Sequence, residues 1–158
     1  MLPTASDSAF MAHQISARLA AVVDALPLRS GVRVLEIGCG PGAAARAVAE
    51  RVGDGHILAI DRSARAVAQA LAACKLEIAS GRMSVRHSAI EDFELRPGEL
   101  PFDFAFAIRV GALDGRHPEL ERKAYERLAR ALKPGGVLYI DGGDPLQGIN
   151  IRSHFGLT

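Results

Sequence analysis

The apolar residues of this chain follow two spacings in alternation, one typical of buried strands and one typical of helices. Short apolar runs, such as residues 32–37, predict buried strands. Stretches in which apolar residues recur every three or four positions predict amphipathic helices, most clearly over residues 118–132. The predicted elements, in chain order, are a helix over 9–26, a strand over 32–37, a helix over 41–52, a strand over 56–60, a helix over 63–74, strands over 83–87 and 102–108, a helix over 118–132 and a strand over 137–140.

This alternation of strands and helices predicts an α/β fold, in which a parallel sheet carries helices on both faces. Polar residues stand at or just past the predicted strand ends, and we expect them to share one rim of the sheet: Glu36, Asp61, His87, Arg109 and Asp141. Ligands of such sheets bind beyond the carboxyl ends of the strands, where the strand order reverses. The rim is therefore the predicted ligand site.

Size and composition limit the classes of function. The 158 residues suffice for one domain but not for a cofactor domain plus a separate substrate domain. The net charge is +1, tryptophan is absent and no basic stripe alternates with aromatic residues, so nucleic acid is not the expected substrate. We expect no membrane span and no secretory leader. The two cysteines form no CxxC pair, which favours a reducing cytoplasm.

A glycine-rich turn links the strand over 32–37 to an alanine-rich helix. Glycine is needed where the backbone takes φ > 0 or where a ligand contacts the backbone directly, and the helix start offers free N–H groups to that ligand. Gly38-x-Gly40-x-x-Ala43, with Asp61 about 20 residues further on, also fits a dinucleotide site. Glu36 separates the alternatives, because a carboxylate beside the turn suits an ammonium or sulfonium group better than a pyrophosphate.

Four separated motifs resemble those of class I S-adenosylmethionine-dependent methyltransferases. The run VLEIGCGPG from Val34 resembles the first motif, and Ile60-Asp61 the acidic end of the second strand. Phe102-Asp103-Phe104 resembles the fourth-strand motif, and the run LKPGG from Leu132 the turn before the fifth strand. The resemblance implies a three-layer Rossmann-like, doubly wound and mostly parallel sheet of order 3-2-1-4-5, with a shortened or missing hairpin of strands 6 and 7.

The resemblance also implies a cofactor, S-adenosyl-L-methionine, and a role for each residue around the glycine turn. Asp61 would accept both ribose hydroxyls through charge-assisted bonds. Glu36 would lie near the methionine ammonium, and Arg62 along the adenine face. Backbone of the turn would lie against the methionine and ribose parts of the cofactor, at Gly38, Cys39 and Gly40.

The segment after the third predicted strand departs from the family pattern. Many members have an acid there that reads the adenine amino group, whereas this chain has Ser88. Ala89 and Ile90 would still hold the adenine ring. Two acids shortly downstream, Glu91 and Asp92, are alternative substitutes for the missing one.

The methyl acceptor is less well defined. The chain lacks the (Asn/Asp)-Pro-Pro-aromatic sequence after the fourth strand that some methyltransferases use on amino nitrogens, which favours a small-molecule acceptor. Arg109 stands where an anionic substrate group or the cofactor carboxylate would meet it. Candidate substrate contacts are His13, Asp141 and Asp144. No catalytic base and no metal ligand is assigned.

The chain is predicted to form one domain over residues 1–158, with a cofactor-binding core over 28–141. Residues 1–27 would form a helix that covers the pocket as a lid, and 142–158 a short tail with at most one strand, over 149–151. An uncovered edge of the fifth strand would promote association, so either the tail or a second subunit is expected to cover it, and a homodimer follows from the second case. The alternative function is a non-catalytic or truncated S-adenosylmethionine-binding domain.

Overall fold

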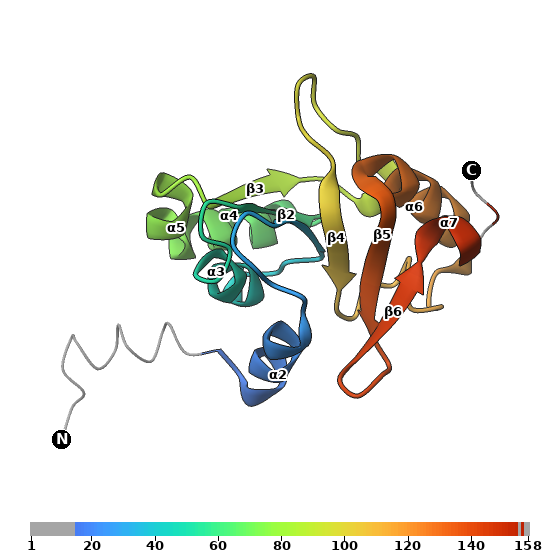
Figure 1. Cartoon of the computed structure of the whole chain (residues 1–158), viewed down its shortest axis with the longest axis horizontal. Helices are drawn as coiled ribbons and strands as arrows, with labels where there is room; N and C mark the ends of the chain where they lie inside the picture. The colour runs from blue at the N-terminus through green and yellow to red at the C-terminus, as the bar shows by residue number, and fades with distance from the viewer. Residues whose placement is uncertain (1–14, 155, 157–158) are drawn as a thin grey trace.

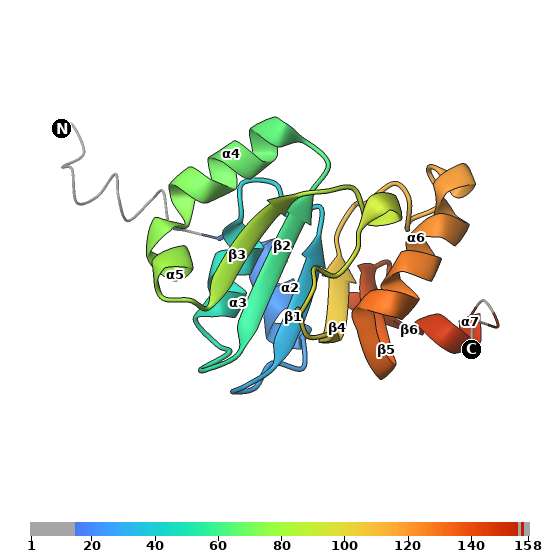
Figure 2. The same ribbon diagram turned by 90° about the horizontal axis from the view of Figure 1, so that it is seen from above.

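The structure, a computed structural model, describes residues 15–154 and 156. Strands and helices alternate along the chain, as the apolar spacing predicts (Figures 1 and 2). The elements are α2 (Ala17–Ala25), β1 (Arg33–Ile37), α3 (Ala43–Ala49), β2 (His56–Asp61), α4 (Ala64–Ala73), α5 (Lys75–Ala79), β3 (Met83–His87), the 3-10 turn η1 (Ile90–Asp92), β4 (Phe102–Ala107), α6 (Pro118–Ala131), β5 (Leu132–Asp141), β6 (Leu146–Asn150) and α7 (Ile151–His154).

One six-stranded sheet organises the molecule, with strand order β3-β2-β1-β4-β5-β6. The first five strands are parallel and β6 is antiparallel to β5. The predicted α/β class and the order 3-2-1-4-5 are therefore confirmed. The chain leaves β1 toward β2 on one side and returns to β4 on the other, so the strand order reverses between β1 and β4. That reversal is where sheets of this kind bind ligands.

Successive residues of the central strands face opposite sides of the sheet and build two separate cores. Leu35 packs on one face with the buried residues of α6, η1 and α7. Its neighbour Val34 packs on the other face with α2, α3 and α4. This alternation is the period-two pattern of a strand that is buried on both sides. The result is the predicted three-layer arrangement, visible in Figure 2.

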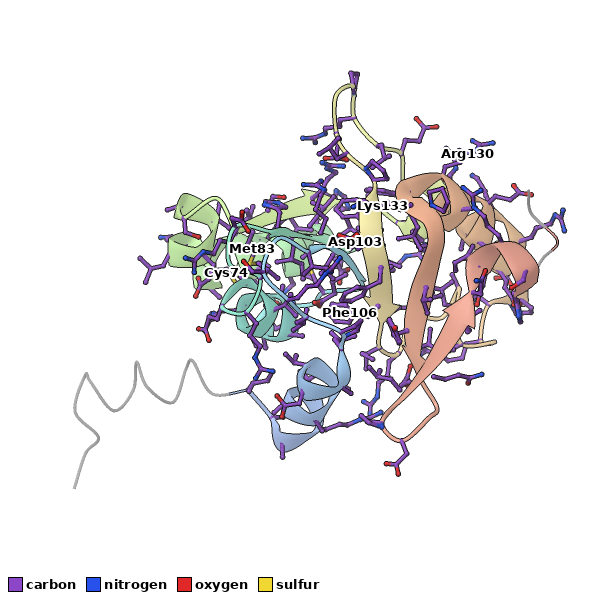
Figure 3. All side chains as sticks on the ribbon, in the orientation of Figure 1. Cys74, Met83, Asp103, Phe106, Arg130 and Lys133 are labelled. Carbon is purple, nitrogen blue, oxygen red and sulfur yellow. The ribbon has the colours of Figure 1, made fainter. Side chains whose placement is uncertain are left out.

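The start of the fifth strand differs from the prediction, which placed it at residues 137–140. Helix α6 ends at Ala131, and β5 begins directly at Leu132, which pairs with Phe102 of β4. Lys133 Nζ donates to Asp103 Oδ1 over 2.8 Å and holds this segment to the base of β4 (Figure 3). The register shifts beyond that pair, so the Pro-Gly-Gly run bulges within the strand instead of preceding it.

The chain's own tail covers the far edge of β5. β6 pairs with it from Val137↔Asn150 to Asp141↔Leu146, over residues the sequence pattern did not predict as a strand in full. Ile151 of α7 is then buried against the core on the α6 face. Of the two coverings expected for this edge, the structure shows the tail. The new outer edge belongs to β6.

Two further features complete the fold. The first helix is described from Ala17, so the part of the predicted helix before residue 15, with His13, lies outside the described residues. The short helix α5 and the turn η1 were not predicted.

Across residues 15–154 and 156, no helix has the length and apolarity required to cross a membrane.

Candidate functional site

The glycine turn between β1 and α3 holds its backbone in conformations that favour glycine. The φ angles are +72° at Gly38, +54° at Gly40 and +90° at Gly42. The N–H groups of Gly38 and Cys39 both donate to the carbonyl of Ile60, over 2.8 and 3.0 Å, and so fasten the turn to the end of β2. A Cβ on Gly42 would lie 2.9 Å from the sulfur of Cys74, so this glycine also permits close packing of the turn against the end of α4.

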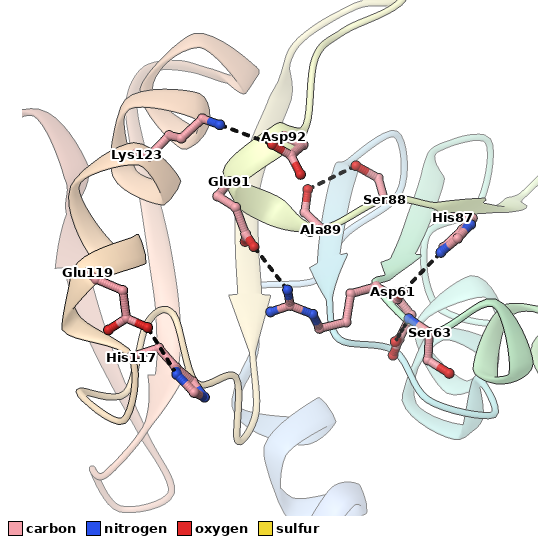
Figure 4. A network of polar contacts seen from close by, with 11 residues as sticks. Asp61, Ser63, His87, Ser88, Ala89, Glu91, Asp92, His117, Glu119 and Lys123 are labelled. Atoms are coloured by element: carbon pink, nitrogen blue, oxygen red, sulfur yellow. Dashed lines mark hydrogen bonds and ion pairs between the residues drawn. The ribbon is translucent and has the colours of Figure 1, made fainter.

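Asp61 ends β2 and adds a further hydrogen bond between that strand and the turn. Its Oδ2 accepts from the N–H of Gly40 over 2.9 Å. Its Oδ1 accepts from the N–H of Ser63 over 2.8 Å (Figure 4). Each carboxylate oxygen has two lone pairs, so both keep capacity for a ligand's hydroxyl groups. The carboxylate is thus fixed in place before any ligand arrives.

Glu36 lies inside β1, one residue before its end, and is only 4 % exposed. Its Oε2 atom is buried without a hydrogen-bond partner among the described residues. Burial, together with the nearby negative charge of Asp61, raises the pKa of the Glu36 carboxyl to about 8. A cationic group placed beside it would stabilise the ionised carboxylate and supply the missing partner. The site therefore has a built-in preference for a positively charged ligand group.

Two cavities open at the carboxyl end of the sheet and meet at Gly38. The first, here called the rim cavity, has a volume of about 300 Å³. It is lined by Ile37, Gly38, Asp61, Arg62, Ser88, Ala89, Ile90, Glu91, Arg109, Val110, Gly111, Ala112, Arg116 and His117. The second, the loop cavity, has about 160 Å³ and is lined by Leu19, Glu36, Gly38, Cys39, Gly40, Pro41, Ala43, Ala44, Phe106 and Ile108.

All ten residues predicted to contact the cofactor line these two cavities. The loop cavity holds Glu36, Cys39 and Gly40, whereas Gly38 borders both. The rim cavity holds the remainder, which are Asp61, Arg62, Ser88, Ala89, Ile90 and Arg109. The sequence motifs, far apart in the chain, therefore converge on two adjoining cavities that share Gly38.

The predicted substrate contacts are placed differently. Asp141 and Asp144 line neither cavity. Asp141 Oδ1 instead accepts from the N–H of Arg109 over 3.1 Å, and its Oδ2 lies 3.9 Å from Arg18 of α2. Asp141 thus holds the backbone of Arg109 beside the rim cavity and does not line the cavity itself.

The structure separates the two acids proposed to replace the acid missing at Ser88. Glu91 lines the rim cavity, is only 6 % exposed and pairs with Arg62 at 3.2 Å. Asp92 does not line the cavity and pairs at 3.1 Å with Lys123 of α6 (Figure 4). Of these two carboxylates, only that of Glu91 lines the site.

The comparisons with known proteins agree with this geometry. The methyltransferase domain family matches residues 34–136, which is more than half of the chain. The chain belongs to the class I S-adenosylmethionine-dependent methyltransferases. This assignment confirms the family predicted from the motifs and its cofactor, S-adenosylmethionine. Glu36 and Asp61 fit that cofactor, since its methionine part carries an ammonium and its ribose carries two hydroxyls.

Individual relatives are similar over most of this methyltransferase domain. Nocamycin O-methyltransferase of Saccharothrix syringae is 35% identical over 124 residues, covering 78% of this chain and 42% of that protein. Protein-L-isoaspartate O-methyltransferase of Methylorubrum populi is 39% identical over 127 residues, covering 80% of this chain and 52% of that protein. The chain thus spans about half the length of the curated relatives it matches.

Solved structures show the same fold. A phosphoethanolamine N-methyltransferase of Haemonchus contortus, in complex with S-adenosylmethionine, superposes with a TM-score of 0.61 at 28% identity. The match covers 78% of this chain and 27% of that one. The [4+2]-cyclase SpnF superposes with a TM-score of 0.61 at 26% identity, covering 85% of this chain and 44% of that one. The fold therefore carries more than one chemistry, and the reaction must be argued from the site.

The sequence did not identify two side chains of the rim cavity, Arg116 and His117. Both stand in the loop between β4 and α6, which returns to the cavity because the N–H of His117 donates to the carbonyl of Gly111 over 2.9 Å. His117 Nδ1 lies 3.2 Å from Glu119 Oε1 (Figure 4). No motif marks this return of the loop.

Proposed function

We propose that the chain catalyses methyl transfer from S-adenosylmethionine to a small-molecule acceptor. The observation that carries this proposal is the buried Glu36 carboxyl, with an unpartnered oxygen at the wall of the loop cavity. Such a group is costly unless a cation completes it. The methionine ammonium of the cofactor would supply that cation.

The chain's residues divide the binding of this cofactor between the two cavities. Glu36 and the backbone of Cys39 and Gly40 would hold the methionine end in the loop cavity. Asp61 would bind the ribose hydroxyls at the junction. In the rim cavity, Glu91 would take the role of the acid that is missing at Ser88 and read the adenine amino group. Its burial beside the cavity supports this role.

When bound, the cofactor supplies an electrophilic methyl group on a sulfonium centre. The chain's own contribution is to position the acceptor in line with that group and to exclude water. Positioning can reduce the barrier by roughly 7–11 kcal/mol. A general base typically contributes a ~10²–10⁴-fold rate increase, which corresponds to only about 3–5 kcal/mol. A catalytic base is therefore not required, and none is assigned.

A small acceptor is supported by the name of one relative. The curated relative from Saccharothrix syringae is by name an O-methyltransferase of nocamycin. We propose neither nucleic acid nor membrane as a partner, and we propose the cytoplasm as the compartment, since Cys39 and Cys74 are both free thiols.

The test uses S-adenosylmethionine with a radiolabelled methyl group and a panel of small alcohols, phenols, carboxylic acids and amines. We expect label to appear in at least one acceptor with the wild-type chain and to be lost with Asp61→Asn. The control is Asp54→Asn, since Asp54 lies in the turn before β2, at the opposite end of that strand. Transfer by Asp61→Asn at the wild-type rate would contradict the proposal.

A second candidate is an S-adenosylmethionine-binding domain without catalysis of its own. The observation that favours it is Ser88, which lines the rim cavity where many family members carry an acid. Binding of the cofactor without transfer to any acceptor in the panel would support this second candidate.

A homodimer through the outer edge of β6 is a further proposal, which the sedimentation coefficient at several concentrations would test.

A further inference from the structure

Arg109, two residues past the end of β4, has a backbone conformation that is unusual for its residue type. Its φ is +58°, and no other non-glycine among residues 15–154 and 156 has a positive φ. A side chain with a Cβ is strained there, whereas glycine would adopt the conformation freely. Strained residues of this kind concentrate at ligand sites. The position therefore points to a task for the arginine side chain.

Both backbone polar groups of Arg109 are held by side chains. Its N–H donates to Asp141 Oδ1 over 3.1 Å, and its carbonyl accepts from Arg116 Nη2 over 2.6 Å. Arg116 is itself held by Asp114, with Nε 2.8 Å from Oδ2. The backbone of Arg109 is thus fixed from both sides beside the rim cavity, which its side chain lines.

The guanidinium of Arg109 differs from the two other arginines of the rim cavity. Arg62 pairs with Glu91, and Arg116 pairs with Asp114. For Arg109, no ion pair or side-chain hydrogen bond occurs within the part of the chain that the structure describes. A planar guanidinium matches a carboxylate or a phosphate through two parallel bonds. An anion is therefore the complementary ligand.

The sequence predicted Arg109 as a cofactor contact, but under the proposed function the anion that it binds is not the carboxylate of the cofactor. The ammonium and the carboxylate of a methionine group are bonded to the same carbon, so both belong at the methionine end of the cofactor. Glu36, the partner of the ammonium under the proposed function, lines the loop cavity, whereas Arg109 lines the rim cavity and not the loop cavity. The guanidinium is left for the second ligand of the reaction.

We propose that Arg109 binds an anionic group, a carboxylate or a phosphate, on the methyl acceptor. This inference rests on the proposed function and narrows the acceptor to anionic small molecules. The loop between β4 and α6 supports this position, since Arg116 of that loop holds the carbonyl of Arg109.

The test is a titration of the protein saturated with S-adenosylhomocysteine, followed by ¹⁵N NMR, with benzoate, inorganic phosphate and the neutral isostere benzamide as probes. We expect at least one of the two anions, benzoate or phosphate, to bind saturably and to shift the signals of Arg109 and Arg116. If benzoate binds, the affinity for benzamide should be at least tenfold lower than the affinity for benzoate. Arg109→Gln should lower the affinity for that anion about tenfold or more and leave the affinity for S-adenosylhomocysteine unchanged. The matched control is Arg130→Gln, an exposed arginine away from both cavities (Figure 3).

Three results would overturn the inference alone. They are saturable binding of neither anion by the wild-type protein, equal anion binding by Arg109→Gln, and weaker S-adenosylhomocysteine binding by Arg109→Gln, which would assign Arg109 to the cofactor. Failure of the wild-type protein to bind S-adenosylhomocysteine contradicts the proposed function, and the inference with it. The two failures are thus distinguishable in the same experiment.

Discussion

The backbone N–H of Gly40 donates to Asp61 Oδ2 over 2.9 Å, and this bond joins the glycine turn to the end of the neighbouring strand β2. The bond fixes the positions of two residues that lie 21 positions apart in the chain relative to each other. It fastens the turn to β2 and holds the carboxylate at the wall of the rim cavity. The same carboxylate therefore anchors the glycine turn and lines the rim cavity.

Asp61→Asn should lower the affinity for S-adenosylhomocysteine by about 100-fold, because two charge-assisted bonds to ribose hydroxyls are lost or weakened. Isothermal titration calorimetry measures the change directly. Thermal unfolding serves as the control, since the amide keeps one oxygen for Gly40 or Ser63 and the fold should survive. An Asp61→Asn variant with wild-type affinity would remove Asp61 from the ribose site.

Glu36 should make cofactor binding depend on pH. Its pKa is raised to about 8 by burial and by Asp61, so the carboxyl is mainly protonated at pH 7 in the free protein. Because a bound ammonium favours the ionised form, binding should release a proton, and affinity should rise from pH 6 to 8. Calorimetry in buffers of different ionisation enthalpy counts that proton. Glu36→Gln should bind about tenfold more weakly and release none.

The same group should affect stability with the opposite slope. A carboxyl whose pKa is raised in the folded state keeps its proton there, while the unfolded chain loses it above the ordinary value of 4.5. Folding stability therefore falls between about pH 4.5 and 8, and does not fall further above pH 8 on account of this group. Denaturant unfolding of wild type and Glu36→Gln should diverge across this range. Parallel curves would show that Glu36 titrates normally.

Glu91 and Asp92 offer a matched pair of adjacent acids. Glu91→Gln should weaken S-adenosylhomocysteine binding about tenfold, since it removes the buried carboxylate of the rim cavity and the partner of Arg62. Asp92→Asn should leave binding unchanged, because its exposed ion pair with Lys123 contributes little. Calorimetry on both variants tests the assignment, and a larger loss in Asp92→Asn would reverse it.

The tail should contribute to the stability of the core. Ile151 is 1% exposed and packs with the residues of the α6 face, so Ile151→Ala should lower the free energy of unfolding by about 2–4 kcal/mol. Arg152→Ala, at the neighbouring exposed position, should change it by less than about 0.5 kcal/mol. Urea unfolding measures both. Equal stabilities would mean that α7 does not pack as described.

Much of the site could be predicted from the sequence because its chemistry is local. The turn at Gly38 and Gly40 needs its glycines for backbone reasons, and Glu36 and Asp61 stand at fixed positions on strands whose apolar runs are clear. Parallel strands bring such ends to one rim whatever the intervening loops do. These residues therefore converge in the structure as the pattern predicts.

The rest depends on tertiary contacts that leave no periodic signal. Whether Glu91 or Asp92 lines the cavity is decided by a single 3-10 turn, in which adjacent side chains point in different directions. Arg116 and His117 reach the site through a hydrogen bond between His117 and Gly111. The strand β6 reads as Leu-Gln-Gly-Ile-Asn, without regular apolar alternation, and its partner β5 determines its conformation.

The central claim is that the glycine turn, Glu36 and Asp61 form a site for S-adenosylmethionine. The most direct test is calorimetric titration of the whole chain with S-adenosylmethionine, S-adenosylhomocysteine and NAD. The structure predicts saturable one-to-one binding of both sulfur ligands and no binding of NAD, whose pyrophosphate would face the buried Glu36. Binding of NAD without either sulfur ligand would contradict the account.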